Sequence, residues 1–247
     1  MMQAAAIILA RAGSKGVPGK NIARVGGRAC IEWTIDSALH SRGVGLVCVS
    51  TDDQAALAIA RGMGVRTIDR PADLAHDTAR IDDAARHALL SLEREGHLAA
   101  YERQPLVILY ANVPVRPADL IDRALDRLAA SGCDSVQSYA PVGKHHPWWT
   151  ARLDADARVA PWEGDVLNHG CFRRQDLPPA YMPDGGVIAL TRRALLREIP
   201  GVPDGPHAFF GLDRRGVVSP EGAVVDIDSP IDLLVADAVL SGRGRGA

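Results

Sequence analysis

One segment near the N-terminus constrains this chain more than any other. Residues 7–10 form a short apolar run, and the chain then breaks into a loop over 11–21 that holds three glycines, one proline and three cations. Such a run bounded by turn residues predicts a buried parallel strand, and α/β proteins bind ligands at the carboxyl ends of these strands. Glycines let backbone N–H groups approach a polyanion, and Arg11, Lys15 and Lys20 supply the countercharge. The segment therefore predicts a phosphate-binding loop.

Two common phosphate-binding motifs do not fit this loop. A P-loop has four residues between its first glycine and the Gly-Lys pair, whereas five separate Gly13 from Gly19, and Asn21 replaces the Mg²⁺-binding hydroxyl. The spacing of Gly13, Gly16 and Gly19 also differs from the dinucleotide-binding pattern Gly-x-Gly-x-x-Gly. On composition alone, a basic surface loop after an edge strand stays open as the alternative.

The order of residues in the loop resembles the N-terminal signature of the acylneuraminate cytidylyltransferases, Ala-Arg-x-x-Ser-Lys-Gly-x-Pro-x-Lys-Asn. The matching positions are Ala10, Arg11, Ser14, Lys15, Gly16, Pro18, Lys20 and Asn21. The resemblance continues along nearly the whole chain. It implies an α/β fold, a three-layer Rossmann-like nucleotidyltransferase sandwich with a mostly parallel sheet. It also implies nucleotide binding by Ala10, Arg11, Gly13, Ser14, Lys15, Lys20 and Asn21.

Length and composition agree with a globular enzyme of this size. The chain has 247 residues, 47% of them hydrophobic and 23% charged, and a formal net charge of -2. This charge argues against nucleic-acid binding, which depends on a basic surface. No apolar stretch approaches ~18 residues, so we expect no membrane span, and the N-terminus lacks a signal-peptide pattern. The four cysteines form no Cys-x-x-Cys pair, which favours reduced thiols and a cytoplasmic location.

Strand-like and helix-like segments alternate through the first half of the chain, which predicts βαβ units. Strands are expected at 46–50, 65–68, 106–110 and 135–139, and helices at 31–41, 53–63, 79–95 and 117–130. Further strands are expected at 186–190 and 223–226, before a final helix that starts at Ser229. We predict a single domain over 1–241 and a flexible tail over 242–247.

The segment from about 144 to 182 has no helix or strand periodicity but contains several aromatic residues. It is too long and too apolar for an ordinary loop, so we interpret it as an excursion from the sheet. In the family that the chain resembles, the corresponding region is a small dimerisation arm that reaches the sugar site of the partner. The resemblance therefore implies a homodimer.

Asp226 and Asp228 follow the expected strand at 223–225. Residues two apart in a strand point the same way, and Mg²⁺ takes one or two carboxylates together with substrate phosphates. The alternative is that these aspartates only precede a helix, although Ser229 and Asp232 already cap that helix. The metal pair of the family falls at this place, which implies that Asp226 and Asp228 bind Mg²⁺.

Three further nucleotide-site residues come from the block 70–78, which also resembles a family motif. There the family arginine and the threonine region contact the cytosine base, which implies roles for Arg70, Asp77 and Thr78. A loop with a helix cap at Asp77 or Thr78 explains the same residues without a nucleotide.

The sugar site shows both matches to the family and departures from it. Arg174 aligns with a family arginine, and a guanidinium there can bind the carboxylate of a sugar acid. Tyr181 matches a family aromatic, and Phe209 and Phe210 match an aromatic pair of the acyl-sugar pocket, although core packing would explain both phenylalanines. Asp184 replaces the family asparagine.

Two departures lie in the same sugar pocket. Tyr110 replaces the glutamine that touches the sugar, and Trp149 replaces a lysine. We therefore predict the same reaction with a different acceptor.

These observations predict a cytidylyltransferase that moves CMP from CTP to an acidic α-keto sugar such as a sialic, legionaminic or pseudaminic acid, releasing pyrophosphate. Arg11 and Lys20 would stabilise the leaving pyrophosphate, and Asp226 and Asp228 would hold the metal; we assign these four residues to catalysis. A Kdo-like sugar acid or a phosphonate is the alternative acceptor. A retired transferase that only binds nucleotide is the alternative from another class.

Overall fold

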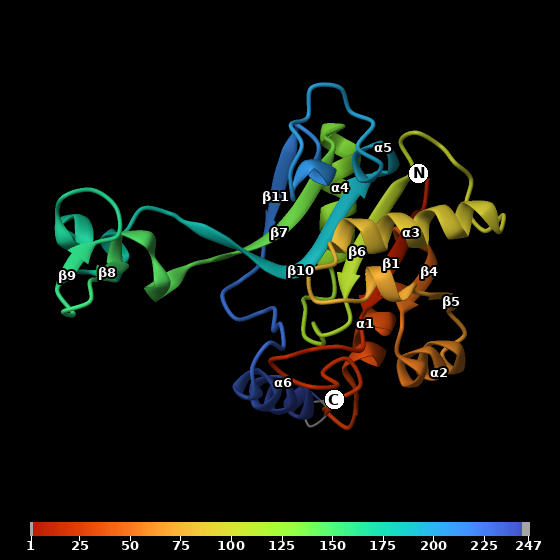
Figure 1. The fold of residues 1–247 in the computed structure, drawn as a ribbon, viewed down its shortest axis with the longest axis horizontal. Helices are drawn as coiled ribbons and strands as arrows, with labels where there is room; N and C mark the ends of the chain where they lie inside the picture. Colours follow the sequence, from red (N-terminus) through yellow and green to blue (C-terminus); the bar gives the residue numbers. More distant parts are fainter. Residues whose placement is uncertain (1, 244–247) are drawn as a thin grey trace.

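The structure, a computed structural model, describes residues 2–243 and is built around one seven-stranded sheet (Figure 1). The strand order is β11-β7-β10-β6-β1-β4-β5. The strands are β1 (Ala4–Ala10), β4 (Val44–Thr51), β5 (Arg66–Asp69), β6 (Pro105–Tyr110), β7 (Ser135–Pro141), β10 (Tyr181–Thr191) and β11 (Arg214–Val218). Each pairing is parallel except those of β10, which runs antiparallel to β6 and β7. The predicted mostly parallel sheet is confirmed.

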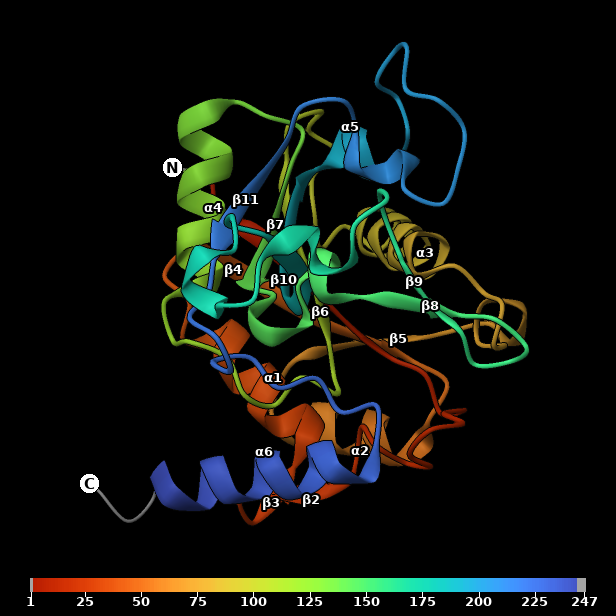
Figure 2. The ribbon, with the colours of Figure 1, turned by 90° about the vertical axis from the view of Figure 1, so that its left-hand side faces the viewer.

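Helices cover both faces of this sheet and complete the three layers (Figure 2). They are α1 (Cys30–Leu39), α2 (Gln54–Gly62), α3 (Ile81–Arg94), α4 (Leu120–Ser131), α5 (Arg192–Leu195) and α6 (Pro230–Arg243). In β1, Ile8 packs with α1, α2 and α4 on one face, whereas Ile7 packs with α3 and α5 on the other. Both faces of β1 are buried, which is why its sequence is apolar throughout. Among residues 2–243, no helix is long and apolar enough to span a membrane.

The last helix lies beside the loop that follows β1. α6 packs on the short hairpin of β2 (Arg24–Val25) and β3 (Arg28–Ala29) and buries Leu240 in a small apolar cluster with Val17 and Ile227. The helix continues to Arg243, two residues into the predicted tail. The remainder of that tail, 244–247, lies outside the described residues.

Between β7 and β10 the chain leaves the sheet and forms an arm that projects from the molecule (Figure 1). The arm, residues 142–180, carries the two-stranded β8 (Ala151–Leu153) and β9 (Val159–Pro161) and four short 3₁₀ turns. The arm joins the sheet at its foot, where Tyr181 of β10 pairs with Pro141 of β7. Several apolar side chains of the arm are exposed, Phe172 to 84%.

One predicted strand is wrong. Residues 223–226 form no strand, and only Val225 makes an isolated antiparallel bridge, to Val115. A turn closed by Ala223 N–H and Pro220 C=O precedes it, and the segment lies against the loop after β6 rather than against a strand. β11 was not predicted, and β10 begins at Tyr181 instead of 186.

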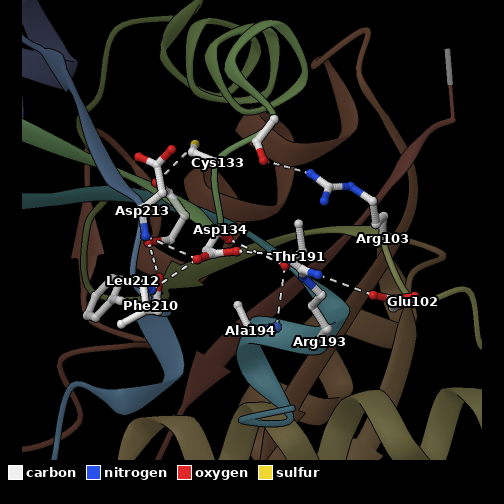
Figure 3. A network of polar contacts seen from close by, with 12 residues as sticks. Glu102, Arg103, Cys133, Asp134, Thr191, Arg193, Ala194, Phe210, Leu212 and Asp213 are labelled. Atoms are coloured by element: carbon white, nitrogen blue, oxygen red, sulfur yellow. Dashed lines mark hydrogen bonds and ion pairs between the residues drawn. The ribbon is translucent and has the colours of Figure 1, made fainter. Parts of the chain in front are cut away.

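A buried carboxylate fixes the long connection between β10 and β11 (Figure 3). Asp134, whose side chain is 8% exposed, accepts hydrogen bonds from Arg193 Nη2 at 3.1 Å and from the backbone N–H groups of Leu212 and Asp213 at 3.0 and 3.1 Å. Gly211 has φ +75°, and a Cβ there would lie 2.4 Å from Asp134 Cβ. Close packing against Asp134 therefore requires glycine and fixes the adjacent turn η6 (Ala208–Phe210).

Candidate active site

A pocket of about 150 Å³ opens where β1 and β6 end, and the loop after β1 forms part of its wall. Five of the predicted nucleotide-site residues line it: Arg11, Ser14, Lys20, Asn21 and Arg70. Ala10 is the last residue of β1, and Gly13 is exposed in the loop. Two of the three loop cations, Arg11 and Lys20, therefore line one cavity, whereas Lys15 does not line it.

Neighbouring segments hold this loop in place. Asp52, at the end of β4, accepts a hydrogen bond from Ala12 N–H at 2.9 Å, and Asn21 Nδ2 donates to the Arg11 carbonyl at 2.8 Å. Asp77 accepts from Lys15 at 2.6 Å and from Arg11 at 2.7 Å. The hydrogen bond from Lys15, followed by the hydrogen bond from Arg11, holds the pKa of Asp77 below its ordinary value. Asp77 thus pairs with two of the three loop cations, Arg11 and Lys15.

Arg70 lies deeper in the pocket than the loop cations. Its guanidinium donates to the Ser50 carbonyl at 2.7 Å, and the residue is 8% exposed. Burial lowers the pKa of Arg70. Thr78 does not line the pocket, and its hydroxyl contacts His76 Nδ1 at 3.0 Å.

Asp226 and Asp228 lie beside the loop, although no strand carries them. Lys20 Nζ is 2.6 Å from Asp228 Oδ1, and Asn112 Nδ2 donates to Asp226 Oδ1. Burial, and then the charge of Asp228, raise the pKa of Asp226 to about 6. A nearby cation stabilises the charged form of such a carboxylate.

Two carboxylates suit the binding mode of Mg²⁺, which completes its shell with phosphates and water. Residues 2–243 contain no group of three or more His, Cys, Asp or Glu side chains that could hold a metal by themselves. The pair therefore fits a metal shared with a phosphate ligand better than a closed structural site.

A buried arginine stands behind this carboxylate pair. Arg116 is 3% exposed, and none of its guanidinium nitrogens has a hydrogen-bond partner among the described residues. Burial lowers the pKa of Arg116 to about 10, although the charges of Asp184 and Asp226 act to raise it. Asp184 itself accepts from Ser138 Oγ and from Gly186 N–H, so the residue that replaces the family asparagine orders the chain near β10.

A second pocket, of about 380 Å³, adjoins the first. Tyr110 and Arg80 line both pockets, and Phe209 and Phe210 line the second. Both phenylalanines are also buried core residues, so this pair packs in the core and lines the pocket as well. Four polar residues of the second pocket were not predicted from the sequence, which are Arg80, Asp82, Gln137 and His207. Arg80 stands two residues after the family-like block 70–78, which was the available signal.

The other predicted sugar-site residues do not reach these pockets within one chain. Trp149 lies on the arm, where its Nε1 donates to the Cys171 carbonyl at 2.9 Å. Arg174 pairs with Glu221 and, with Tyr181, lines a separate pocket of about 210 Å³ at the foot of the arm. The predicted sugar site is therefore divided between the body and the arm.

The central sheet with helices on both faces, and with a cation-lined pocket at the strand ends, defines a Rossmann-like nucleotidyltransferase fold. A solved structure titled CMP:2-keto-3-deoxy-manno-octonic acid synthetase complexed with CTP superposes with a TM-score of 0.69 at 17% identity, covering 98% of this chain and 99% of that chain. A sequence model described as cytidylyltransferase matches residues 5–181. The chain belongs to this cytidylyltransferase family.

Curated relatives agree with that family. N-acylneuraminate cytidylyltransferase of Streptococcus agalactiae serotype V is 30% identical over 199 residues, 80% of this chain and 45% of the relative. CMP-N,N'-diacetyllegionaminic acid synthase of Legionella pneumophila is 26% identical over 97% of both chains. Pseudaminic acid cytidylyltransferase of Campylobacter jejuni is 28% identical over 92% of this chain and 91% of the relative. The chain spans about half the length of the N-acylneuraminate cytidylyltransferases that it matches.

Proposed function

We propose that this protein transfers CMP from CTP to a hydroxyl of an acidic α-keto sugar, a nonulosonate, and releases pyrophosphate. The observation that carries the proposal is the pair of adjoining pockets. One is lined by Arg11, Lys20 and Arg70, and the other by an aromatic pair, with Tyr110 and Arg80 on the shared wall. A reaction between a triphosphate and a second substrate needs such an arrangement, because the reacting atoms must meet at a common boundary.

Within the first pocket, the loop cations have a defined task. Arg11, Lys15 and Lys20 bind the triphosphate and offset the negative charge that grows on pyrophosphate as it leaves. In-line attack on a phosphoryl group depends mainly on positioning and charge stabilisation, so no covalent intermediate on the protein is needed. To bind Arg11 and Lys15, the triphosphate must replace Asp77, which pairs with both side chains.

We assign Mg²⁺ to Asp226 and Asp228. When bound, the metal supplies Lewis-acid polarisation of the α-phosphoryl group. Asn112 donates to Asp226 Oδ1 and so orients this carboxylate, and the charges of Lys20 and Arg116 offset part of the rise in its pKa. Asp228→Asn should abolish turnover without lowering Tm, because the Asp228 side chain is 73% exposed. Full activity of this variant, or of the wild type in excess EDTA, would contradict the assignment.

We further propose a homodimer formed by the arm. The arm projects from the body and exposes Trp162 to 58% and Phe172 to 84%. Large exposed aromatic groups of this kind are enriched in the buried centres of interfaces. Light scattering at micromolar concentration should give twice the mass of the chain, and Phe172→Asp should lower it. A monomeric wild type would exclude the dimer, together with a role for Arg174 in the partner's site.

The compartment that we propose is the cytoplasm, since the four cysteines are free thiols. The test of the whole proposal is pyrophosphate release from CTP with a panel of sugar acids: N-acetylneuraminate, N,N′-diacetyllegionaminate, pseudaminate and Kdo. We expect release with at least one nonulosonate. CTP binding without release on any acceptor would favour the retired nucleotide-binding protein instead, and release with Kdo alone would favour the octulosonate alternative.

A further inference from the structure

Arg80 stands on the wall between the two pockets, just before α3. The lining of the second pocket contains one arginine or lysine, which is Arg80. Arg80 Nε lies 3.1 Å from Asp82 Oδ1, and Nη2 donates to the Gly205 carbonyl at 2.8 Å and to Asp82 Oδ2 at 3.3 Å. Nη1 has no hydrogen-bond partner among residues 2–243. Two sides of the guanidinium are thus anchored, and the third is available for a ligand.

The surroundings of Arg80 carry excess positive charge. The Asp82 side chain is 1% exposed and contacts Arg80, Arg86 and Arg197. Arg86 also pairs with Asp83 at 2.6 Å. Three guanidinium groups therefore face two carboxylates, which leaves one positive charge unneutralised at the edge of the second pocket. An anionic ligand would complete this cluster.

The chemistry of the proposed acceptor fixes where its anion must lie. In an α-keto sugar acid the carboxylate is bonded to the anomeric carbon, which also bears the attacking hydroxyl. When that hydroxyl faces the α-phosphate, its carboxylate must lie at the boundary of the two pockets. Arg80 is at this boundary, whereas Arg174 is at the foot of the arm and pairs with Glu221.

We propose that Arg80 binds the carboxylate of the acceptor through Nη1 and so sets the preference for sugar acids over neutral sugars; this rests on the function proposed above. Asp82 and the Gly205 carbonyl position the guanidinium for that contact. Because Gly205 belongs to the connection that leads to Phe209 and Phe210, the same hydrogen bond ties the carboxylate-binding group to the aromatic wall of the pocket.

The test compares a carboxylate acceptor with an uncharged partner. The probes are N,N′-diacetyllegionaminate, or whichever acid of the panel the wild type uses best, and the C1 methyl ester of the same sugar. Arg80→Ala should lower kcat/KM for the acid by roughly a hundredfold, the scale for a hydrogen bond to a charged group. It should change kcat/KM for the ester by less than about threefold and leave the KM for CTP nearly unchanged. Arg80→Lys should recover part of the loss on the acid.

Arg197→Ala is the matched control, because it removes another arginine from Asp82 but lines neither pocket. It should leave the preference for acid over ester intact. Equal losses on acid and ester in Arg80→Ala would assign Arg80 a purely structural role and overturn the proposal. Loss of the preference in Arg174→Ala but not in Arg80→Ala would overturn it as well. A wild type that uses no sugar acid would instead contradict the proposed function itself, and the role of Arg80 with it.

Discussion

Asp82→Asn should destabilise the protein strongly, because this one carboxylate serves three arginines. Its side chain is 1% exposed, while those of Arg80, Arg86 and Arg197 are 36%, 22% and 28% exposed. An asparagine offers one acceptor oxygen and turns an NH₂ group toward the remaining guanidinium groups. Removing one partner of a buried charge pair costs about 3–5 kcal/mol. For a chain of this length, that loss lowers Tm by roughly 6–20 °C.

Urea unfolding at pH 7 measures this loss, with Asp83→Asn as the neighbouring control. The Asp83 side chain is 37% exposed and has a single arginine partner, Arg86 at 2.6 Å, so its loss should cost no more than about 1 kcal/mol. Equal effects of the two substitutions, or a loss below about 1 kcal/mol for Asp82→Asn, would refute the reasoning.

The same comparison has a defined pH dependence. Burial pushes the pKa of Asp82 upward, but hydrogen bonds from Arg197 and Arg80 outweigh burial and hold it below its ordinary value of 3.8. A lowered pKa means that the charged carboxylate stabilises the folded state above the unfolded pKa. That stability is lost as the pH falls through the folded pKa. The difference between wild type and Asp82→Asn should therefore be constant near neutral pH and shrink below about pH 4.

Further predictions concern the substrates. Lys20→Ala and Arg11→Ala should each lower kcat by roughly a hundredfold or more, the scale for removing one charge-stabilising group, as measured by pyrophosphate release; normal turnover in both would make the loop a solvated surface feature. N-acetylneuraminate should have a lower kcat/KM than the deoxy nonulosonates, because Tyr110, together with Trp149 on the arm that the proposed dimer brings to this site, offers its polar tail few hydrogen-bond partners. Tyr110→Gln should narrow that gap, and a wild-type preference for N-acetylneuraminate would show that these two residues do not select the acceptor.

The sequence predicted best what short segments determine by themselves. The apolar run that ends at Ala10 had to be a buried strand, and the cations that follow it within ten residues had to share its carboxyl end. Phe209 and Phe210 came from the resemblance to the family, as two adjacent residues of one short segment. For these residues, proximity in the chain already implies proximity in space.

Residues that tertiary packing brings together were harder to predict. Arg80, Gln137 and His207 come from three different segments, and no spacing in the sequence links them. The expected strand at 223–226 failed for the same reason, because a strand needs a partner strand and this segment forms an isolated bridge with Val115 in the loop after β6. The division of the sugar site between body and arm depends on the length and direction of the arm, which composition does not determine.

The contact between the loop after β1 and the segment around Asp228 has a consequence for biosynthesis. Lys20 and Asp228 are 208 positions apart, and a Cβ on Gly16 would lie only 2.3 Å from the Asp228 carbonyl oxygen. Lys20 is therefore synthesised 208 residues before the carboxylate with which it pairs. A nascent chain that stops before residue 226 has neither carboxylate of the pair, however well its sheet has formed. Under the proposed function, the growing polypeptide therefore cannot use CTP until residue 228 has been added.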